Sequence, residues 1–241
     1  ARAVLAAPAN TSPEELDEAY KIISELAAGS GLEFEVREEV IANEITPDIK
    51  VIVFLEQPNN LGSLAANAPG TQFVAISSQD WSPPSNGTII LKDETHVAFL
   101  SGYLSALLAP NFRVGALLVS ENSINNQAYL NGVSYFCGQC ASVVYPLNRY
   151  PLTSQQPANS SPANWQAAFN EINANKINVL YIPDTVASAD LGTYLSSYDI
   201  AVIGDQTPPD ELRSRWVATI SSDGLIPLQE IWSDLLDGQG G

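Results

Sequence analysis

Residues 1–36 read ARAVLAAPANTSPEELDEAYKIISELAAGSGLEFEV and contain one complete strand–helix–strand unit. The apolar run RAVLAA at 2–7 predicts a short buried strand, and LEFEV at 32–36 predicts the next one. Between them, Ser12 is positioned to cap a helix whose first residue is Pro13. The segment therefore predicts an α/β fold in which strands and helices alternate.

The same cycle of strand, polar turn and amphipathic helix recurs to the end of the chain. Further strands are predicted at 50–56, 71–77, 88–91, 113–120, 142–147, 178–183, 199–204 and 216–220. Further helices are predicted near 59–67, 93–110, 126–136, 161–172, 187–197 and 224–237. The helix at 93–110 is apolar on almost every turn, which predicts burial on more than one side. Strands rich in Val and Ile that alternate with helices predict parallel sheets covered on both faces.

Composition narrows the class of protein. The chain has 241 residues, of which 45% are apolar and 15% charged, so it can build one large or two smaller globular domains. With 27 acidic and 10 basic residues, its formal net charge of −17 disfavours nucleic acid and anionic membrane surfaces as partners. No apolar run approaches the roughly 20 residues of a membrane span. The absence of Met and the start at ARAVLAAP predict a processed segment of an exported protein.

The residues that most often carry metal or redox chemistry are scarce. Cys137, Cys140 and His96 are the only cysteines and histidine, too few for a zinc site of the usual ligand set, and we expect no metal. The cysteine pair is a candidate disulfide, with a thioredoxin-type redox pair as the alternative. His96 is expected to be structural rather than a general base, because no Gly-x-Ser-x-Gly motif accompanies it. No dinucleotide or Walker motif follows any strand, so no cofactor is expected.

One long segment resembles a known family. Residues 94–122, ETHVAFLSGYLSALLAPNFRVGALLVSEN, resemble the acidic-x-x-x-Phe-Leu-x-Gly-Tyr-Leu helix and the following Val-Gly strand of the basic membrane protein family. Members of that family are nucleoside-binding lipoproteins of ABC transporters. PGTQFVAIS at 69–77, Gly132 and AVIGDQ at 201–206 resemble further parts of the same pattern.

The resemblance implies the type I periplasmic binding protein fold. That fold has two doubly wound parallel-sheet lobes with an interlobe cleft for the ligand. The boundary is predicted near Pro110 and Asn111. It gives an N-terminal lobe of residues 1–111 plus about 221–241 and a C-terminal lobe of residues 112–220.

Ligands of open parallel sheets bind at the carboxyl ends of the strands, so the candidate ligand-binding residues are strand-end residues. They are Asn10, Thr11, Glu56, Gln57, Ser77, Asp80, Trp81, Glu121, Asn122, Asp184, Asp205, Gln206 and Ser221 to Asp223. Trp81 either stacks on a planar ligand or covers the sheet edge, whereas Trp165, Trp216 and Trp232 are expected in the core.

The family pattern implies a role for Asp205, which would suit ribose hydroxyls. The sequence departs from that pattern in the first loop, which lacks the Asp and aromatic of the family, and at Ser77, where the family has Asp. A lysine expected after the strand at 216–220 is also replaced. The acidic stretch 33–48 is a solvated sheet edge or, alternatively, a docking face for a basic partner.

These features predict an extracytoplasmic, non-enzymatic solute-binding protein that delivers a small polar ligand, a nucleoside by the family's precedent, to an ABC permease. The chain would be periplasmic or on the cell surface, and any membrane attachment would come from a lipid anchor outside it. The alternative is a ligand-sensing or degenerate binding domain of the same fold that signals to a protein partner. A hydrolase that uses Asp184 and Asp205 as an acid/base pair is a third class, without a supporting motif.

Overall fold

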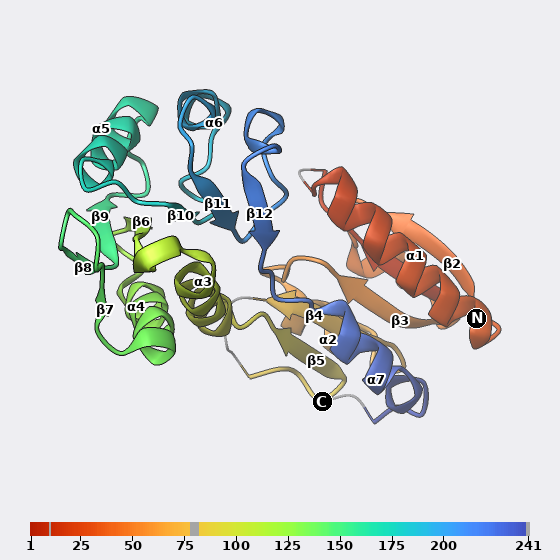
Figure 1. Cartoon of the computed structure of the whole chain (residues 1–241). Coiled ribbons are helices and arrows are strands. Elements are labelled where there is room, and N and C mark those ends of the chain that lie inside the picture. Colours follow the sequence, from red (N-terminus) through yellow and green to blue (C-terminus); the bar gives the residue numbers. More distant parts are fainter. Residues whose placement is uncertain (10, 78–81, 240–241) are drawn as a thin grey trace. The chain divides into compact units, whose positions relative to one another are not determined.

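The computed structural model describes residues 1–9, 11–77 and 82–239 (Figure 1). By its internal contacts the chain divides into two compact units. Unit 1 comprises Ala1–Lys92 with Asp223–Gly241, and unit 2 is the continuous segment Asp93–Ser222. Within the described residues, no helix is long and apolar enough to cross a membrane.

Unit 1 is built on a five-stranded parallel sheet, called sheet 1 here. Its strands lie in the order β2-β1-β3-β4-β5. Their bounds are β1 (Arg2–Ala6), β2 (Glu33–Arg37), β3 (Ile49–Phe54), β4 (Gln72–Ser77) and β5 (Gly87–Leu91). The helical segments of unit 1 are α1 (Pro13–Gly29), η1 (Ala42–Glu44), α2 (Leu61–Asn67) and α7 (Leu225–Leu236). As expected, the Ser12 side chain caps α1 by accepting a hydrogen bond from the backbone N–H of Glu15.

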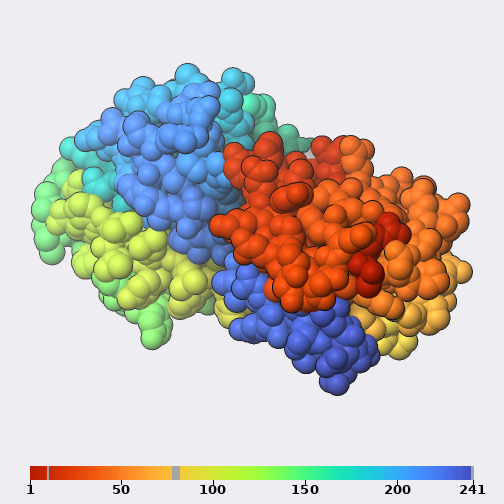
Figure 2. Space-filling model, turned by 90° about the vertical axis from the view of Figure 1, so that its right-hand side faces the viewer, coloured from red at the N-terminus to blue at the C-terminus, as the bar shows by residue number. Residues whose placement is uncertain are grey.

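Both faces of sheet 1 are covered, because successive side chains of each strand point to opposite faces. Leu5 of β1 packs in a cluster with residues of α1 and α7, whereas the neighbouring Val4 packs in a second cluster with residues of α2. Trp232 of α7 is buried in the first cluster and donates a hydrogen bond from its indole N–H to Ser30 Oγ. In Figure 2, α7 (dark blue) lies against the surface formed by α1 (red).

Unit 2 repeats this plan around sheet 2, whose strand order is β12-β11-β10-β6-β9. Its strands are β6 (Val114–Val119), β9 (Leu152–Gln156), β10 (Val179–Ile182), β11 (Ala201–Gly204) and β12 (Trp216–Thr219). Its helical segments are α3 (Glu94–Leu108), η2 (Pro110–Phe112), α4 (Ser123–Cys137), α5 (Pro162–Asn173), α6 (Ala189–Ser196) and η3 (Asp210–Leu212). A small antiparallel pair, β7 (Cys140–Ala141) and β8 (Arg149–Tyr150), lies apart from sheet 2.

Numbered within its own unit, each sheet has the strand order 2-1-3-4-5, which is one of the two common doubly wound orders. The prediction of two parallel α/β sheets is therefore confirmed. The strand predicted at 142–147 is wrong: this segment forms bends between β7 and β8, and the strand that joins sheet 2 is LTSQQ at 152–156. The strand at 152–156 was missed because it is polar. The segment at 142–147 was taken for a strand because it is apolar and rich in β-forming residues.

Helices α3 and α4 cross with their backbones in contact. A Cβ atom on Gly102 would lie 2.0 Å from the Tyr129 carbonyl oxygen, and one on Gly132 would lie 1.9 Å from that of Phe99. Glycine at both positions is what permits this approach. Because α3 packs on α4, the first crossing between units falls at Lys92 and Asp93, whereas the sequence analysis placed it near Pro110.

The buried surface of α3 is narrower than its composition suggested. Its small residues, among them Ala98, Ser101 and Gly102, are buried, but Leu100 and Leu107 are half exposed. The helix is thus buried where it meets α4 and the strands β10 and β11, and it is exposed on the side of the two leucines. Of the three tryptophans expected in the core, Trp165 and Trp232 are buried and Trp216 is partly buried.

Candidate functional site

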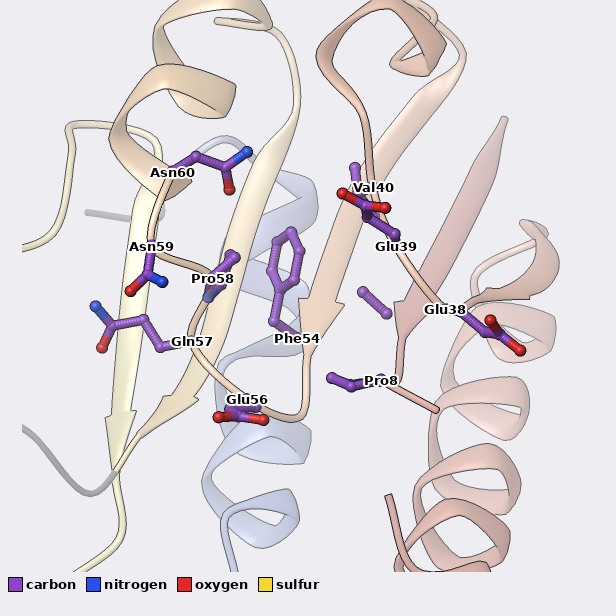
Figure 3. A pocket seen from close by; sticks show the side chains of 11 residues that line it. Pro8, Glu38, Glu39, Val40, Phe54, Glu56, Gln57, Pro58, Asn59 and Asn60 are labelled. Atoms are coloured by element: carbon purple, nitrogen blue, oxygen red, sulfur yellow. The ribbon is translucent and has the colours of Figure 1, made fainter. Parts of the chain in front are cut away.

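The carboxyl ends of β1 and β3 border a hollow of about 230 Å³ in unit 1 (Figure 3). These two strands flank the point where the strand order of sheet 1 reverses, which is where doubly wound sheets bind their ligands. The lining residues come from the ends of β1 and β3 and from the segment after β2. They are Ala6, Pro8, Glu38, Glu39, Val40, Phe54, Glu56, Gln57, Pro58, Asn59 and Asn60.

The hollow has an apolar floor and a polar rim. Figure 3 shows the Phe54 ring at its centre, between Pro58 on one side and Val40 with Glu39 on the other. The ring stacks on Phe73 of β4 with centroids 6.5 Å apart, so its position is fixed by the core. The floor can therefore contact an apolar ligand face while the rim offers hydrogen-bonding groups.

The rim owes its shape to the turn between β3 and α2. The backbone N–H of Leu61 donates to the Pro58 carbonyl, and that of Ser63 donates to the Asn60 carbonyl. These bonds use backbone groups and leave the side chains of Asn59 and Asn60 on the rim of the hollow. Glu56 and Gln57, which the sequence analysis named as strand-end candidates, belong to the same turn.

A second hollow of about 330 Å³ lies on the other side of this turn, toward β4 and β5. It shares Glu56, Gln57 and Asn59 with the first hollow and adds Ser77 and Lys92. The Ser77 hydroxyl donates a hydrogen bond of 3.0 Å to Gln57 Oε1, and Lys92 Nζ lies 3.1 Å from Glu15 Oε1. Three of the predicted site residues, Glu56, Gln57 and Ser77, are thus brought together within unit 1.

Glu38, Glu39 and Glu56 give the first hollow an acidic rim. Among the described residues these three carboxylates form no ion pair, whereas nearby Arg37 pairs with Glu35 and Glu44. Glu38 and Glu39 were assigned to a solvated acidic edge. They directly follow β2, so the strand-end rule that selected Glu56 would also have selected them.

The carboxyl ends of sheet 2 carry the predicted residues of unit 2. Glu121 follows β6 and accepts hydrogen bonds from Ser120 Oγ at 2.9 Å and from the Ala158 N–H at 3.2 Å. A hydrogen bond from its own backbone N–H, together with these two, lowers the pKa of the Glu121 carboxyl below its ordinary value. Glu121 therefore ties the end of β6 to the segment after β9, and Asn122 beside it is exposed.

Asp205, at the end of β11, is held by two hydrogen bonds. Its Oδ1 accepts from the Asp184 backbone N–H at 2.6 Å, and its Oδ2 accepts from the Tyr181 hydroxyl at 3.1 Å. Burial raises the pKa of the Asp205 carboxyl, while these two bonds oppose that shift. Burial also raises the pKa of the Tyr181 hydroxyl, so this group acts as a donor at neutral pH.

The contacts of Tyr181 continue into the core of unit 2. Its ring stacks on that of fully buried Tyr129, with centroids 4.9 Å apart. Tyr181 was not among the predicted site residues, because it lies inside the apolar run NVLYIP, where an aromatic residue is expected to belong to the core. Asp184 and Asp205 are neighbours, but the contact between them joins a backbone N–H to a carboxylate.

The remaining predicted residues have different surroundings. The side-chain nitrogen of Gln206 is buried without a hydrogen-bond partner among the described residues, and its backbone carbonyl accepts from Thr219 Oγ1. Ser221 is exposed, and Asp223 Oδ1 accepts from the Leu225 N–H at the start of α7. The Thr11 N–H donates to the Pro8 carbonyl. Asn10, Asp80 and Trp81 lie outside the described residues.

The two cysteines and the histidine, the candidates for metal or redox chemistry, have partners within the protein. Cys137 and Cys140 form a disulfide at the end of α4. His96 is 80% exposed and pairs with Asp93, the residue that caps α3. Over the described ranges, no three His, Cys, Asp or Glu side chains are grouped as they would be to hold a metal ion.

Comparison with known proteins identifies the fold. No protein-family model and no curated protein sequence matches the chain. Solved structures do match over nearly its whole length, and the neighbours described next are binding proteins or regulators. The fold is that of the type I periplasmic binding proteins, which confirms the fold expected from the resemblance.

Three of these neighbours show the range of proteins that share the fold. A transcriptional activator of the comK gene from Bacillus halodurans aligns with a TM-score of 0.68 at 10% identity, over 100% of this chain and 84% of that chain. The arabinose-binding protein AraP from Geobacillus stearothermophilus gives 0.64 at 12% identity, over 97% and 87%. A LacI family regulator from Enterococcus faecium with bound ribose gives 0.57 at 12%, over 98% and 89%.

Proposed function

We propose that this chain is the extracytoplasmic solute-binding component of an ABC transporter and that it binds a small, hydroxyl-rich solute without transforming it. The fold is shared with solute-binding proteins, including the arabinose-binding protein described above. The transport role, the ABC permease as partner and a location outside the cytoplasm are parts of this proposal. The resemblance of residues 94–122 to nucleoside-binding lipoproteins makes nucleosides the first solutes to test.

The observation that carries the proposal is the hollow at the ends of β1 and β3. Its position agrees with the place where doubly wound sheets bind ligands. Carboxylates accept hydrogen bonds from sugar hydroxyls, and the amides of Gln57, Asn59 and Asn60 both donate and accept. The Phe54 ring offers a flat apolar surface of the kind that packs against a sugar ring or a base.

The size of the two hollows supports a small ligand. Ligand pockets commonly enclose roughly 300–1,000 Å³. The first hollow, at about 230 Å³, lies just below that range, and the second, at about 330 Å³, lies at its lower end. We infer that the solute has the size of a sugar or a nucleoside and that Glu56, shared by both hollows, contacts it.

We also propose that strand-end residues of unit 2 contribute to binding. Asp205 is the foremost of them, because its carboxylate has lone pairs beyond those that accept from Asp184 and Tyr181. Hydroxyl groups of a solute would add to these bonds. Asn122 and Asp184 are the other candidates in this unit.

The test is a thermal-shift screen of the purified protein against nucleosides, pentoses, hexoses and amino acids, followed by calorimetric titration of each hit. A ligand at 100 times its dissociation constant stabilises a protein by about 2.7 kcal/mol, which such a screen detects. We expect a shift with nucleosides or sugars. No shift with any solute class would contradict solute binding.

A matched pair of variants locates the site. Glu56→Gln removes one carboxylate from both hollows and is expected to weaken binding roughly tenfold or more, since a hydrogen bond to a charged group contributes about 1.5–3 kcal/mol. Glu18→Gln makes the same change on the exposed face of α1, outside both hollows, and should leave the affinity unchanged. If the two variants weakened binding equally, the solute would bind outside the two hollows.

A ligand-sensing or degenerate domain is the second candidate, favoured by the regulators among the neighbours of the same fold. A sensor would bind the solute as a transport protein does, so the screen cannot separate the two. Permease genes beside this gene would support transport. A DNA-binding or kinase segment in the same reading frame would support sensing.

A further inference from the structure

The segment between β7 and β8 presents large apolar side chains to solvent. Its apolar tip, defined as Val143, Val144, Tyr145 and Leu147, is 85%, 51%, 80% and 70% exposed, respectively. Four such residues within five positions form a contiguous apolar surface, unlike single scattered ones. The pairing of β7 with β8 (Figure 1) and the disulfide between Cys137 and Cys140 of β7 hold the base of the segment.

Part of the backbone of the tip is hydrogen-bonded from inside the protein. Arg113 Nη2 donates to the Val144 carbonyl at 3.0 Å and to the Tyr145 carbonyl at 2.7 Å. The Ser142 hydroxyl donates to the Val144 carbonyl and accepts from the Val144 N–H. Pro146 has no N–H to satisfy. Three backbone groups of the tip, the Val144 N–H and the Val144 and Tyr145 carbonyls, are therefore bonded within the protein, which lowers the cost of moving them out of water.

The charged residue nearest to the tip in the sequence, Arg149, is basic, although the chain as a whole is acidic. Residues 122–170 contain no Asp or Glu, although the chain has 27 of them. Arg149 of β8 is exposed beside the tip. Lys176 is exposed next to Asn175, whose carbonyl accepts from the Tyr150 hydroxyl. Together with Arg113, which donates to the tip carbonyls, these residues place basic side chains next to the tip.

We propose that the apolar tip inserts into the interfacial region of a lipid bilayer and that Arg149 and Lys176 contact its anionic headgroups. Aliphatic side chains with a tyrosine suit the boundary between headgroups and acyl chains, and basic neighbours add attraction to anionic lipid. The net charge of −17 opposes this contact at long range, and salt at physiological concentration screens such interactions beyond about 8 Å. This contact does not depend on solute binding.

The chemistry favours a bilayer over a second copy of the chain. Val143 and Tyr145 are each at least 80% exposed, so they project from the protein and offer no concave surface to an identical tip. A bilayer needs no shape complementarity, and it is favoured by both features found here, a sequence stretch without Asp or Glu around the tip and a backbone that is partly bonded within the protein. A protein groove is the other occupant that a projecting apolar tip would fit.

The test measures co-sedimentation of the full chain with vesicles of phosphatidylcholine alone and with one quarter phosphatidylglycerol. We expect binding that is stronger to the anionic vesicles and weakens as salt is raised. Val143→Ser with Leu147→Ser should reduce the partition coefficient about tenfold or more, from the apolar surface withdrawn from the bilayer. Both positions are exposed, so folding is expected to be preserved and is checked by the melting temperature.

Two further measurements make the outcome specific to the tip. Ile124→Ser removes an equally exposed aliphatic side chain from α4 and should leave partitioning unchanged. A Leu147→Cys variant labelled with an environment-sensitive dye should brighten on vesicles, whereas the same label in an Ile226→Cys variant on α7 should not. Failure of the protein to bind either vesicle, or binding that the serine variants leave intact, would overturn the proposal and leave a protein groove as the occupant of the tip.

Discussion

Asp205 carries its charge where burial disfavours it. Because its folded-state pKa is raised, Asp205 contributes stability that is fully present below the pKa of the unfolded chain. That contribution is lost as the pH rises through the folded-state pKa. At neutral pH the ionised carboxylate therefore costs folding free energy, which the hydrogen bonds from Asp184 and Tyr181 partly offset. A residue held at such a cost in a strand-end position is a candidate for ligand contact.

The Asp205→Asn variant tests this electrostatic account. Asparagine cannot titrate, so the stability of the wild type relative to the variant should increase as the pH falls from about 7.5 to about 4.5. The measurement is the difference between their melting temperatures at the two pH values. The variant also loses one hydrogen-bond acceptor, a carboxylate oxygen of Asp205. This loss lowers its stability equally at both pH values, so it does not affect the comparison. Asp234→Asn, an exposed carboxylate of α7, controls for overall charge. A difference that stays constant with pH would show that Asp205 titrates as an ordinary carboxylate.

At the scale of elements, the crossing of α3 and α4 leaves no room for a side chain at its glycines. Gly102→Ala would improve the helix propensity of α3, yet its new methyl group would meet the Tyr129 carbonyl oxygen at 2.0 Å. We expect the clash to dominate, with a destabilisation of unit 2 of about 1–3 kcal/mol. Hydrogen exchange of α3 and α4 amides measures it.

Gly62→Ala in α2 is the matched control, because a Cβ there would meet no atom within 4 Å. This change is expected to stabilise unit 1 by roughly 0.5–1 kcal/mol. If both alanines were stabilising, the two helices would have to separate more readily than their backbone contact implies.

The elements also show what sequence patterns can and cannot predict. Strands buried on both faces, such as Ile49–Phe54, were found because continuous apolar runs have few other interpretations. The edge strand Leu152–Gln156 was missed because only tertiary pairing with β6 makes a polar segment a strand. The segment 142–147 was mistaken for that strand because its valines and tyrosine resemble strand residues, although the fold leaves them in solvent.

The candidate site, like the fold, could be predicted in part from the sequence. The rule that ligands meet strand ends selected Glu56, Gln57 and Ser77, which border the hollows of unit 1. It did not indicate that Phe54, a residue of the strand itself, would form a pocket floor. That outcome depends on the turn after β3, whose path is set by packing.

At the scale of the whole molecule, the chain crosses between its two units at Lys92 and at Ser222. Unit 2 is continuous in sequence, whereas unit 1 is completed by the last segment of the chain. Leu225, Leu228, Trp232 and Leu235 of α7 are buried in the cluster that covers one face of sheet 1. The integrity of unit 1 therefore depends on residues more than a hundred positions away in the sequence.

Trp232→Ala tests whether each unit has its own stability. Truncation of a buried tryptophan costs about 3–5 kcal/mol, so amide exchange in unit 1 should accelerate roughly a hundredfold or more. Hydrogen exchange followed by mass spectrometry should show this acceleration in 1–92 and 223–239, with 93–222 unchanged. Phe169→Ala, which removes a fully buried ring from the core of unit 2, should give the opposite pattern. Because each ring lies in the core of one unit, acceleration of both units by either variant would mean that the chain unfolds as a single cooperative body.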